Sequence, residues 1–150
     1  RVRHVLLVTL ATLTLASGCA TANQPRSTST KSETQSARSE KVVLAIRTPR
    51  HTKVALLTAR QMLSGESTYT PDEVAIVACG GAVPALQQSS KLADDVAKTR
   101  EMGADIAACG LTIEAKGLDA DSLADGVRVV PNGLVEIARL QSEGYHSVEL

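Results

Sequence analysis

Two short segments of this chain end in the same pair of residues. Residues 76–80 read IVACG and residues 106–110 read IAACG, so Cys79 and Cys109 lie thirty positions apart. A cysteine thiolate is a nucleophile that can attack another sulfur atom, form a disulfide or bind a metal ion. In both segments an apolar run precedes the cysteine and a glycine follows it, which predicts a buried strand that ends in a turn. Both cysteines are therefore candidates for thiol chemistry.

The surrounding sequence alternates short apolar runs with helical stretches, a pattern typical of βαβ units on a parallel sheet. The predicted strands are residues 42–46, 74–78, 104–108, 127–130 and 146–150. Five strands with helices between them predict an α/β fold, a three-layer α/β/α sandwich with a parallel five-stranded sheet. In such open sheets, ligands and catalytic groups gather at the carboxyl ends of the strands. Cys79 and Cys109 are both expected at that edge.

The helices are expected to turn their regularly spaced apolar residues toward the sheet. In the helix predicted over residues 53–63, this inner face consists of Val54, Leu57, Thr58 and Met62. In the last helix, which Asn132 is expected to cap, it consists of Leu134, Ile137 and Ala138.

Each candidate cysteine also precedes a helical segment. The positive end of a helix stabilises a thiolate and lowers its pKa, which favours a reactive cysteine. Turns between strands and helices also use small residues for packing alone, however. A sulfur-handling or redox role and a buried structural role therefore both stay open for Cys109. For Cys79 the sequence favours a structural residue or a disulfide partner.

The composition excludes several classes of function. Residues 41–150 contain eleven basic and fourteen acidic side chains, and the only aromatic residues of the chain are Tyr69 and Tyr145. A slightly acidic surface without stacking rings is not expected to bind nucleic acid. The three histidines are far apart and the chain has no CxxC motif, so we expect no metal site and no cofactor. A small-anion or nucleotide site at Cys79-Gly80-Gly81 is a distant alternative, since no phosphate-binding motif follows.

The first forty residues differ from the rest. Residues 1–18 join a basic start to an uncharged run rich in Leu, Val, Ala and Thr, which is typical of an export signal. Residues 15–19, LASGC, resemble the lipobox of bacterial lipoproteins. In a lipobox the cysteine, here Cys19, becomes the lipidated first residue. Ordinary cleavage after Ala20-Thr21-Ala22 is the alternative.

Residues 19–40 are rich in Ser and Thr and nearly free of apolar side chains, which predicts a disordered tether. The folded domain is then residues 41–150. A lipid on Cys19 would hold this domain at a membrane, so the expected location is the bacterial cell envelope, facing the periplasm or the exterior.

Two parts of the folded domain resemble the DsrE/DsrF-like sulfur-transfer family, with its small exported branch as the nearest match. Residues 103–109 end a strand in Cys109, and the basic Lys116 and then Gly117 follow where that family ends a short helix. Residues 129–133, VVPNG, and the EI, LQ and GY pairs after them resemble the closing segment of the same family. The resemblance covers about residues 42–149.

The resemblance implies a function and a set of partners. Active members of the family carry sulfur as a persulfide on the cysteine that Cys109 matches, and the family assembles into trimers or hexamers. A sulfur-donor or acceptor protein with a reactive thiol would be a further partner. Thr112, in the turn after the cysteine, would hold the loop or donate a hydrogen bond.

The family fold also implies that the strands before Cys79 and Cys109 are neighbours, close enough for a disulfide. Two further interpretations of the pair follow. A structural disulfide would make the domain a non-catalytic binding or assembly module tethered to a membrane. A reversible dithiol would let one sulfur attack and the other resolve the product.

Overall fold

The computed structural model describes residues 39–150, which form one α/β unit. The strands are β1 (Lys41–Ile46), β2 (Glu73–Ala78), β3 (Asp105–Cys109), β4 (Arg128–Val130) and β5 (Tyr145–Glu149). The helices are α1 (Pro49–Leu63), α2 (Ala93–Glu101), α3 (Gly110–Lys116) and α4 (Gly133–Ser142), with 3₁₀ helices η1 (Gly80–Leu86) and η2 (Ala120–Ser122). No helix within residues 39–150 is long and apolar enough to cross a membrane. The predicted signal sequence and Cys19 lie outside the described residues.

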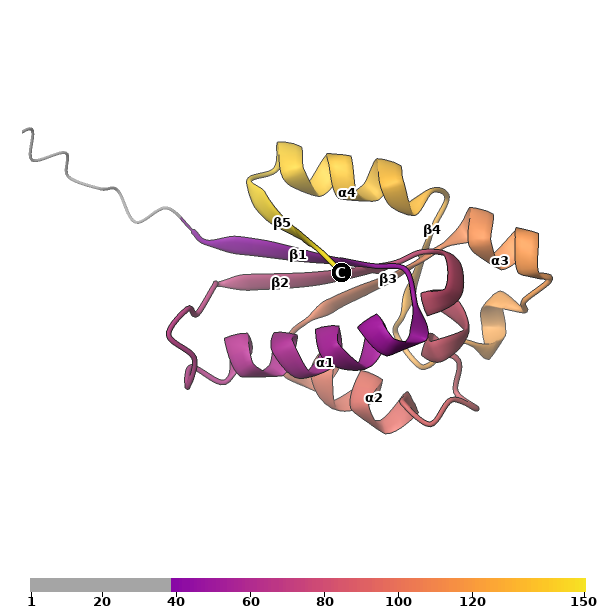
Figure 1. The fold of residues 1–150 in the computed structure, drawn as a ribbon, viewed down its shortest axis with the longest axis horizontal. Helices are drawn as coiled ribbons and strands as arrows, with labels where there is room; N and C mark the ends of the chain where they lie inside the picture. Colours follow the sequence, from indigo (N-terminus) through magenta and orange to yellow (C-terminus); the bar gives the residue numbers. More distant parts are fainter. Residues whose placement is uncertain (1–38) are drawn as a thin grey trace, which may run out of the picture. The chain divides into compact units, whose positions relative to one another are not determined.

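The strands form a single sheet in the order β4-β3-β2-β1-β5, and every neighbouring pair is parallel. Helices α1 and α2 cover one face of this sheet, and α4 covers the other (Figure 1). Helix α3 and η1 lie beyond the carboxyl ends of the strands (Figure 1). The predicted fold, a three-layer α/β/α sandwich on a parallel five-stranded sheet, is confirmed.

Two apolar clusters form the core, one on each face of the sheet. Alternate side chains of a strand point to opposite faces, so Val42, Leu44 and Ile46 pack toward α1 while Val43 and Ala45 pack toward α4. The central strands β1, β2 and β3 are buried on both sides, which explains their continuous apolar runs. The sequence contains no Phe and no Trp, so this core consists of aliphatic contacts.

The predicted inner face of α1 is only partly right, since Met62 packs partly buried against the core. The helix buries Thr52, Ala55, Leu56 and Ala59, whereas Val54 is 46 % exposed and Leu57 is 51 % exposed. Small alanine side chains let the helix axis approach the sheet closely, and larger side chains on this face would hold it away. Apolar spacing alone could not distinguish this small-residue face from the bulkier one beside it.

The predicted inner face of α4 is only partly right. Ile137 is buried, but Leu134 is 53 % exposed and Ala138 is exposed. The helix buries Gly133, Glu136, Ile137 and Leu140 instead. A buried glutamate breaks the usual apolar pattern. Ion pairs with Arg128 and Arg139 offset the cost of removing its charge from water.

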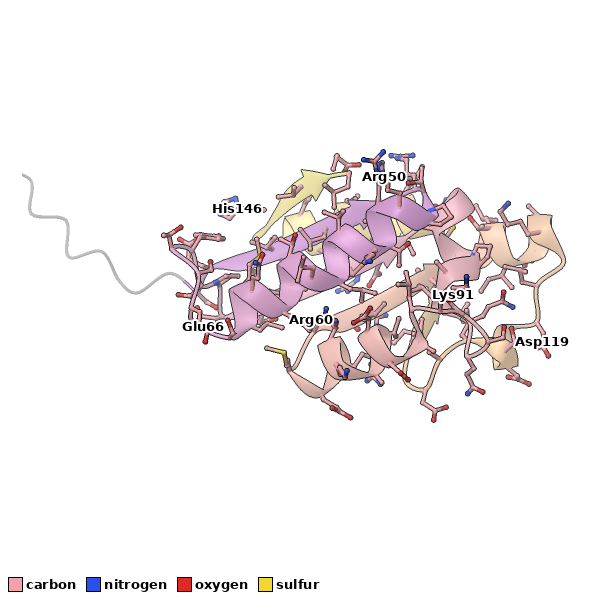
Figure 2. The ribbon with its side chains drawn as sticks, turned by 60° about the horizontal axis from the view of Figure 1, so that its bottom comes forward. Arg50, Arg60, Glu66, Lys91, Asp119 and His146 are labelled. Atoms are coloured by element: carbon pink, nitrogen blue, oxygen red, sulfur yellow. The ribbon has the colours of Figure 1, made fainter. Side chains whose placement is uncertain are left out.

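A polar contact joins the two helices on the other face. The guanidinium of Arg60 on α1 donates to Asp95 Oδ1 at 3.0 Å and to Thr99 Oγ1 at 3.3 Å, both on α2. Figure 2 shows Arg60 at this junction, while Arg50 and Glu66 lie near opposite ends of α1. Arg60 therefore fixes α2 against α1 beneath the sheet.

Candidate functional site

Cys79 and Cys109 lie side by side at the carboxyl edge of the sheet. Strands β2 and β3 pair in the register Ala78↔Ala108, so the two cysteines are the next residues of two adjacent strands. Both keep extended backbone angles, φ −126° and ψ 164° at Cys79 and φ −71° and ψ 116° at Cys109. Adjacent parallel strands are about 5 Å apart. The structure therefore brings the two predicted thiols together, and both are free.

Both sulfur atoms lie on the face of the sheet that α4 covers. The pleat places Cys79 on the same face as Val77, and Cys79 packs against the apolar cluster beneath α4. Its own N–H donates to the Ile46 carbonyl at 2.9 Å, which extends the β1–β2 ladder by one residue. Cys109 is 4 % exposed, whereas Cys79 is half-buried.

Gly133, the first residue of α4, closes over the two cysteines. Its backbone N–H donates to Cys109 Sγ at 3.2 Å, across 24 positions of the sequence. A Cβ atom at this position would collide with Cys79 Sγ and lie 3.1 Å from Cys109 Cβ. Only a residue without a side chain therefore lets the helix terminus approach both thiols.

Asn132 sets the start of α4, as the sequence predicted. Its Oδ1 accepts a hydrogen bond from the Leu134 N–H at 3.0 Å, the usual role of an N-cap side chain. The Gly133 amide is left to point at the Cys109 sulfur. The positive end of the helix dipole thus faces the atom that would carry a thiolate charge.

Thr112 connects the two cysteine turns. It lies in the first turn of α3, and its hydroxyl accepts a hydrogen bond from the Gly80 N–H at 2.9 Å. Gly80 has φ +56°, a left-handed conformation that suits glycine, and it follows Cys79 directly. Thr112 therefore holds the turn after Cys79 against the helix that begins after Cys109.

Opposing effects set the pKa of Cys109. Burial raises it, but hydrogen bonds from the Gly133 amide, from the amide and hydroxyl of Thr112 and from the Cys79 thiol lower it, and the net pKa is below the ordinary value of 9.0. The Cys109 sulfur accepts no capping hydrogen bond from the backbone of α3. The hydrogen bond from the Gly133 amide, at 3.2 Å, is therefore the best-formed contact to this sulfur. The site favours the thiolate form of Cys109.

The neighbouring thiol behaves in the opposite way. Burial, the charge of Cys109 and the hydrogen bond between the two sulfurs together raise the pKa of Cys79 to about 11. Arg47 and Glu149 act on this pKa in opposite directions, and they pair with each other at 3.6 Å. At neutral pH Cys79 is therefore a protonated thiol beside a sulfur that ionises more readily.

A charged network that the sequence analysis missed holds α4 in place. Arg128 on β4 donates to Asp105 Oδ1 at 2.8 Å and to Glu136 Oε1 at 2.9 Å, and Arg139 donates to Glu136 Oε1 at 2.8 Å. Hydrogen bonds from Arg139 and Arg128 outweigh the opposing effect of burial and lower the pKa of Glu136 to about 2. A glutamate between apolar helix residues was the available signal.

The remaining predicted residues lie away from the thiols. Gly117 ends α3 with φ +61°, and Lys116 is exposed in the last turn. A helix of seven residues is about 10 Å long, so both lie at the far end of α3 from Cys109. Within residues 39–150, no three His, Cys, Asp or Glu side chains gather as metal ligands.

The chain is similar to proteins of a known family and to several solved structures. The DsrE/DsrF-like family matches residues 40–150, and no curated protein matches the sequence. Among solved structures, MTH1491 from Methanobacterium thermoautotrophicum, a protein of unknown function, is 26 % identical with a TM-score of 0.66. It covers 74 % of this chain and 99 % of its own.

Two further structures share the fold at lower identity. BT1422 from Bacteroides thetaiotaomicron is 16 % identical with a TM-score of 0.60, over 74 % of this chain and 95 % of its own. The ychN protein of E. coli is 17 % identical with a TM-score of 0.58, over 74 % of this chain and 99 % of its own.

Proposed function

The chain belongs to the DsrE/DsrF-like family, and on that premise we propose that its folded domain takes up sulfane sulfur on Cys109 as a persulfide. The observation that carries this proposal is the hydrogen bond from the Gly133 amide to the Cys109 sulfur. An amide at a helix terminus stabilises negative charge, on a thiolate and equally on a persulfide anion.

The uptake step is a displacement at sulfur. The Cys109 thiolate attacks a sulfane sulfur of the donor, a new bond forms at Cys109 Sγ, and one S–S bond of the donor breaks. The donor's leaving sulfur takes the electron pair. Because Cys109 is only 4 % exposed, we expect small linear donors such as polysulfide to react faster than bulky ones. A second protein thiol would then accept the sulfur.

Mass spectrometry of the intact protein tests this function. In a Cys19→Ser background, polysulfide should add one sulfur atom that reductant removes and that maps to Cys109. Cys109→Ser should abolish the gain, because burial, the largest of the effects that raise the pKa of Cys79, still disfavours its thiolate in this variant. A gain that persists without Cys109 would refute the assignment.

The same measurement addresses the structural alternative, which the closeness of the two thiols supports. A permanent Cys79–Cys109 disulfide gives a mass two hydrogens lower that polysulfide never changes. The domain would then be a membrane-tethered binding or assembly module, and a double Cys→Ala variant would lose stability but no chemistry.

We also propose that the domain works as a trimer or hexamer in the bacterial cell envelope, held by a lipid on Cys19. Exposed apolar side chains near the carboxyl edge, Leu111, Leu134 and Val135, offer a surface for self-association. Light scattering measures the number of subunits in the assembly. Membrane fractionation tests the anchor, and a Cys19→Ser variant that stays in the membrane fraction would refute it.

A further inference from the structure

The two thiols are arranged for a reaction with each other after sulfur has been taken up. They occupy adjacent register positions on one face of the sheet, where the spacing of parallel strands falls within the Cα–Cα range of disulfides. Each thiol acts on the pKa of the other. A disulfide therefore requires rotation of the side chains but no large movement of the backbone.

Gly133 lies against both cysteines. The helix terminus lies so close that any side chain on Gly133 would collide with Cys79 Sγ. The start of α4 therefore lies against both Cys79 and Cys109, and Cys79 packs partly buried against the apolar cluster beneath that helix. A sulfur atom added to Cys109 would have Cys79 as its nearest thiol.

The two thiols also differ in a way that suits successive roles. Cys109 accepts a hydrogen bond from the Gly133 amide, which lowers the pKa of its thiol, whereas burial and the neighbouring Cys109 raise the pKa of Cys79. Cys79 thus does not compete for the sulfur donor. It keeps the proton that a leaving sulfide requires.

We propose that Cys79 resolves a persulfide on Cys109 and releases the sulfane sulfur as hydrosulfide. This inference rests on the proposed uptake of sulfur by Cys109. It makes the domain a two-electron reductase of sulfane sulfur, beyond the role of a carrier that passes the atom on unchanged.

The step balances without another reactant. The Cys79 proton passes to the terminal sulfur of the neighbouring persulfide anion, and the Cys79 sulfur attacks Cys109 Sγ as it ionises. The bond between Cys109 Sγ and the sulfane sulfur breaks, and a Cys79–Cys109 disulfide forms. The sulfane sulfur takes the electron pair of the broken bond and the Cys79 proton, and it departs as HS⁻. The two cysteine sulfurs are oxidised by two electrons, and the sulfane sulfur is reduced by two. A dithiol reductant, either a small molecule or a protein with a paired-cysteine site, regenerates the two thiols.

Single-turnover measurements on the full chain test the proposal, with Cys19→Ser as the background so that only two thiols remain. The reduced protein is treated anaerobically with one equivalent of polysulfide. Hydrosulfide produced after the uptake step is measured with a sulfide electrode, and the protein mass is recorded over time. The expected sequence is a gain of one sulfur atom, followed by its loss together with two hydrogens as HS⁻ appears.

Cys79→Ser is the matched variant, because it removes the second nucleophile and keeps a hydroxyl of similar size. It should hold the added sulfur on Cys109, and the release of HS⁻ after uptake should slow at least ~10-fold. Cys79→Ala provides a second version that does not depend on the hydroxyl group. Non-reducing electrophoresis should show the wild-type disulfide within one chain, and a disulfide between two chains would overturn the proposal.

The outcomes separate this inference from the function on which it rests. If both Cys79 variants and the wild type keep the added sulfur equally long, Cys79 does not resolve the persulfide, and the uptake function stands. If neither Cys79 variant gains sulfur on Cys109, the uptake function itself fails and the inference fails with it. Release of HS⁻ in the wild type alone, with an internal disulfide as product, supports both.

Discussion

The turns after β2 and β3 share the sequence pattern IxACG and yet give their cysteines opposite properties. Cys79 leads into a 3₁₀ helix and has no amide hydrogen bond to its sulfur from that helix. Cys109 leads into α3 and receives the amide of a different helix, α4. The pKa of Cys79 is raised to about 11 by burial and by its neighbour, while that of Cys109 is lowered because several donors outweigh its burial.

This difference shows that the local motif does not decide the reactivity. Both cysteines end a strand and both precede a helical segment, so a rule based on position treats them alike. The distinguishing group is the Gly133 amide, which approaches from the layer above the sheet and bonds to only one of the two sulfurs. Variants that alter this contact, or the residues that hold α4 in place, should reduce the difference between the pKa values of the two thiols. Titration of each thiol measures that difference directly.

The largest expected effect is the separation of the two thiols in a titration. Thiolate absorbance in a Cys19→Ser background should rise in two steps, the first below pH 9 and the second near pH 11. The two steps should be well separated, because the site lowers the pKa of Cys109 and raises that of Cys79. The steps belong to the coupled pair, so the variants assign them.

In Cys109→Ser the remaining thiol should titrate below 11, because the charge and hydrogen bond of Cys109 no longer raise its pKa. In Cys79→Ala the remaining thiol should titrate higher than in the wild type, because Cys109 loses a donor. Two equal steps near pH 9 in the wild type would contradict the contrast.

Gly133→Ala should produce the next largest effect. The added methyl group meets Cys79 Sγ and Cys109 Cβ, and overpacking of this kind costs about 2 kcal/mol of unfolding free energy, about 30-fold in the folding equilibrium. Urea unfolding measures the loss.

The control for this variant is Gly133→Ala combined with Cys79→Ala. Removing the colliding sulfur should restore more than half of the lost stability, and the two changes should be clearly non-additive. If the double variant is as unstable as the sum of the two single variants, the collision with Cys79 is not the cause.

Glu136→Gln should weaken the support of α4. The two arginines that contact Glu136 are partly exposed, so solvent screening reduces the effect to about 1.5 kcal/mol at pH 7, roughly tenfold in the folding equilibrium. Because the pKa of Glu136 is lowered to about 2 in the folded state, its contribution is present above pH 4.5 and disappears as the pH falls toward 2. Urea unfolding at pH 7 and at pH 3 measures the difference.

Glu143→Gln is the matched control for this prediction. Among residues 39–150, Glu143 forms an ion pair only with Arg139, and it is about half exposed. Its replacement should therefore change stability by less than about 0.5 kcal/mol. Equal losses in the two variants, or a Glu136→Gln effect that does not shrink in acid, would count against the role of the buried carboxylate.

The smallest expected effect belongs to Thr112→Val. Losing the hydroxyl should raise the pKa of Cys109, because the Thr112 hydroxyl is one of the groups that lower it. The rise should be small, since the backbone amides of Gly133 and Thr112 remain in place. Thiolate absorbance of the Cys79→Ser protein measures the shift. Thr112→Ser keeps the hydroxyl and should leave the pKa of Cys109 unchanged, so an equal rise in both variants would refute the assignment.

Sequence reasoning predicted much of the frame of the site. Continuous apolar runs indicated β1, β2 and β3, because strands that are covered on both faces need apolar residues throughout. Asn132 indicated the start of α4, since an N-cap depends only on residues next to it. The parallel topology then placed Cys79 and Cys109 at one edge.

The helix faces show where this reasoning stops. Apolar spacing predicted that Val54 and Leu57 of α1 face the sheet. The face with Ala55 and Ala59 packs there instead, because close approach of the helix requires small side chains. On α4, spacing could not anticipate that Glu136 would be buried, because its partner Arg128 lies on strand β4, outside the helix.

The sequence by itself determined which residues end the strands and therefore that both cysteines lie at one edge of the sheet, because strand formation and helix capping depend on neighbours along the chain. Only the tertiary structure decided which thiol ionises. The Gly133 amide is 24 positions from Cys109 and reaches its sulfur across the layer between β3 and α4. A pKa depends on charges and dipoles within a few ångströms in space, and folding is what brings those groups together.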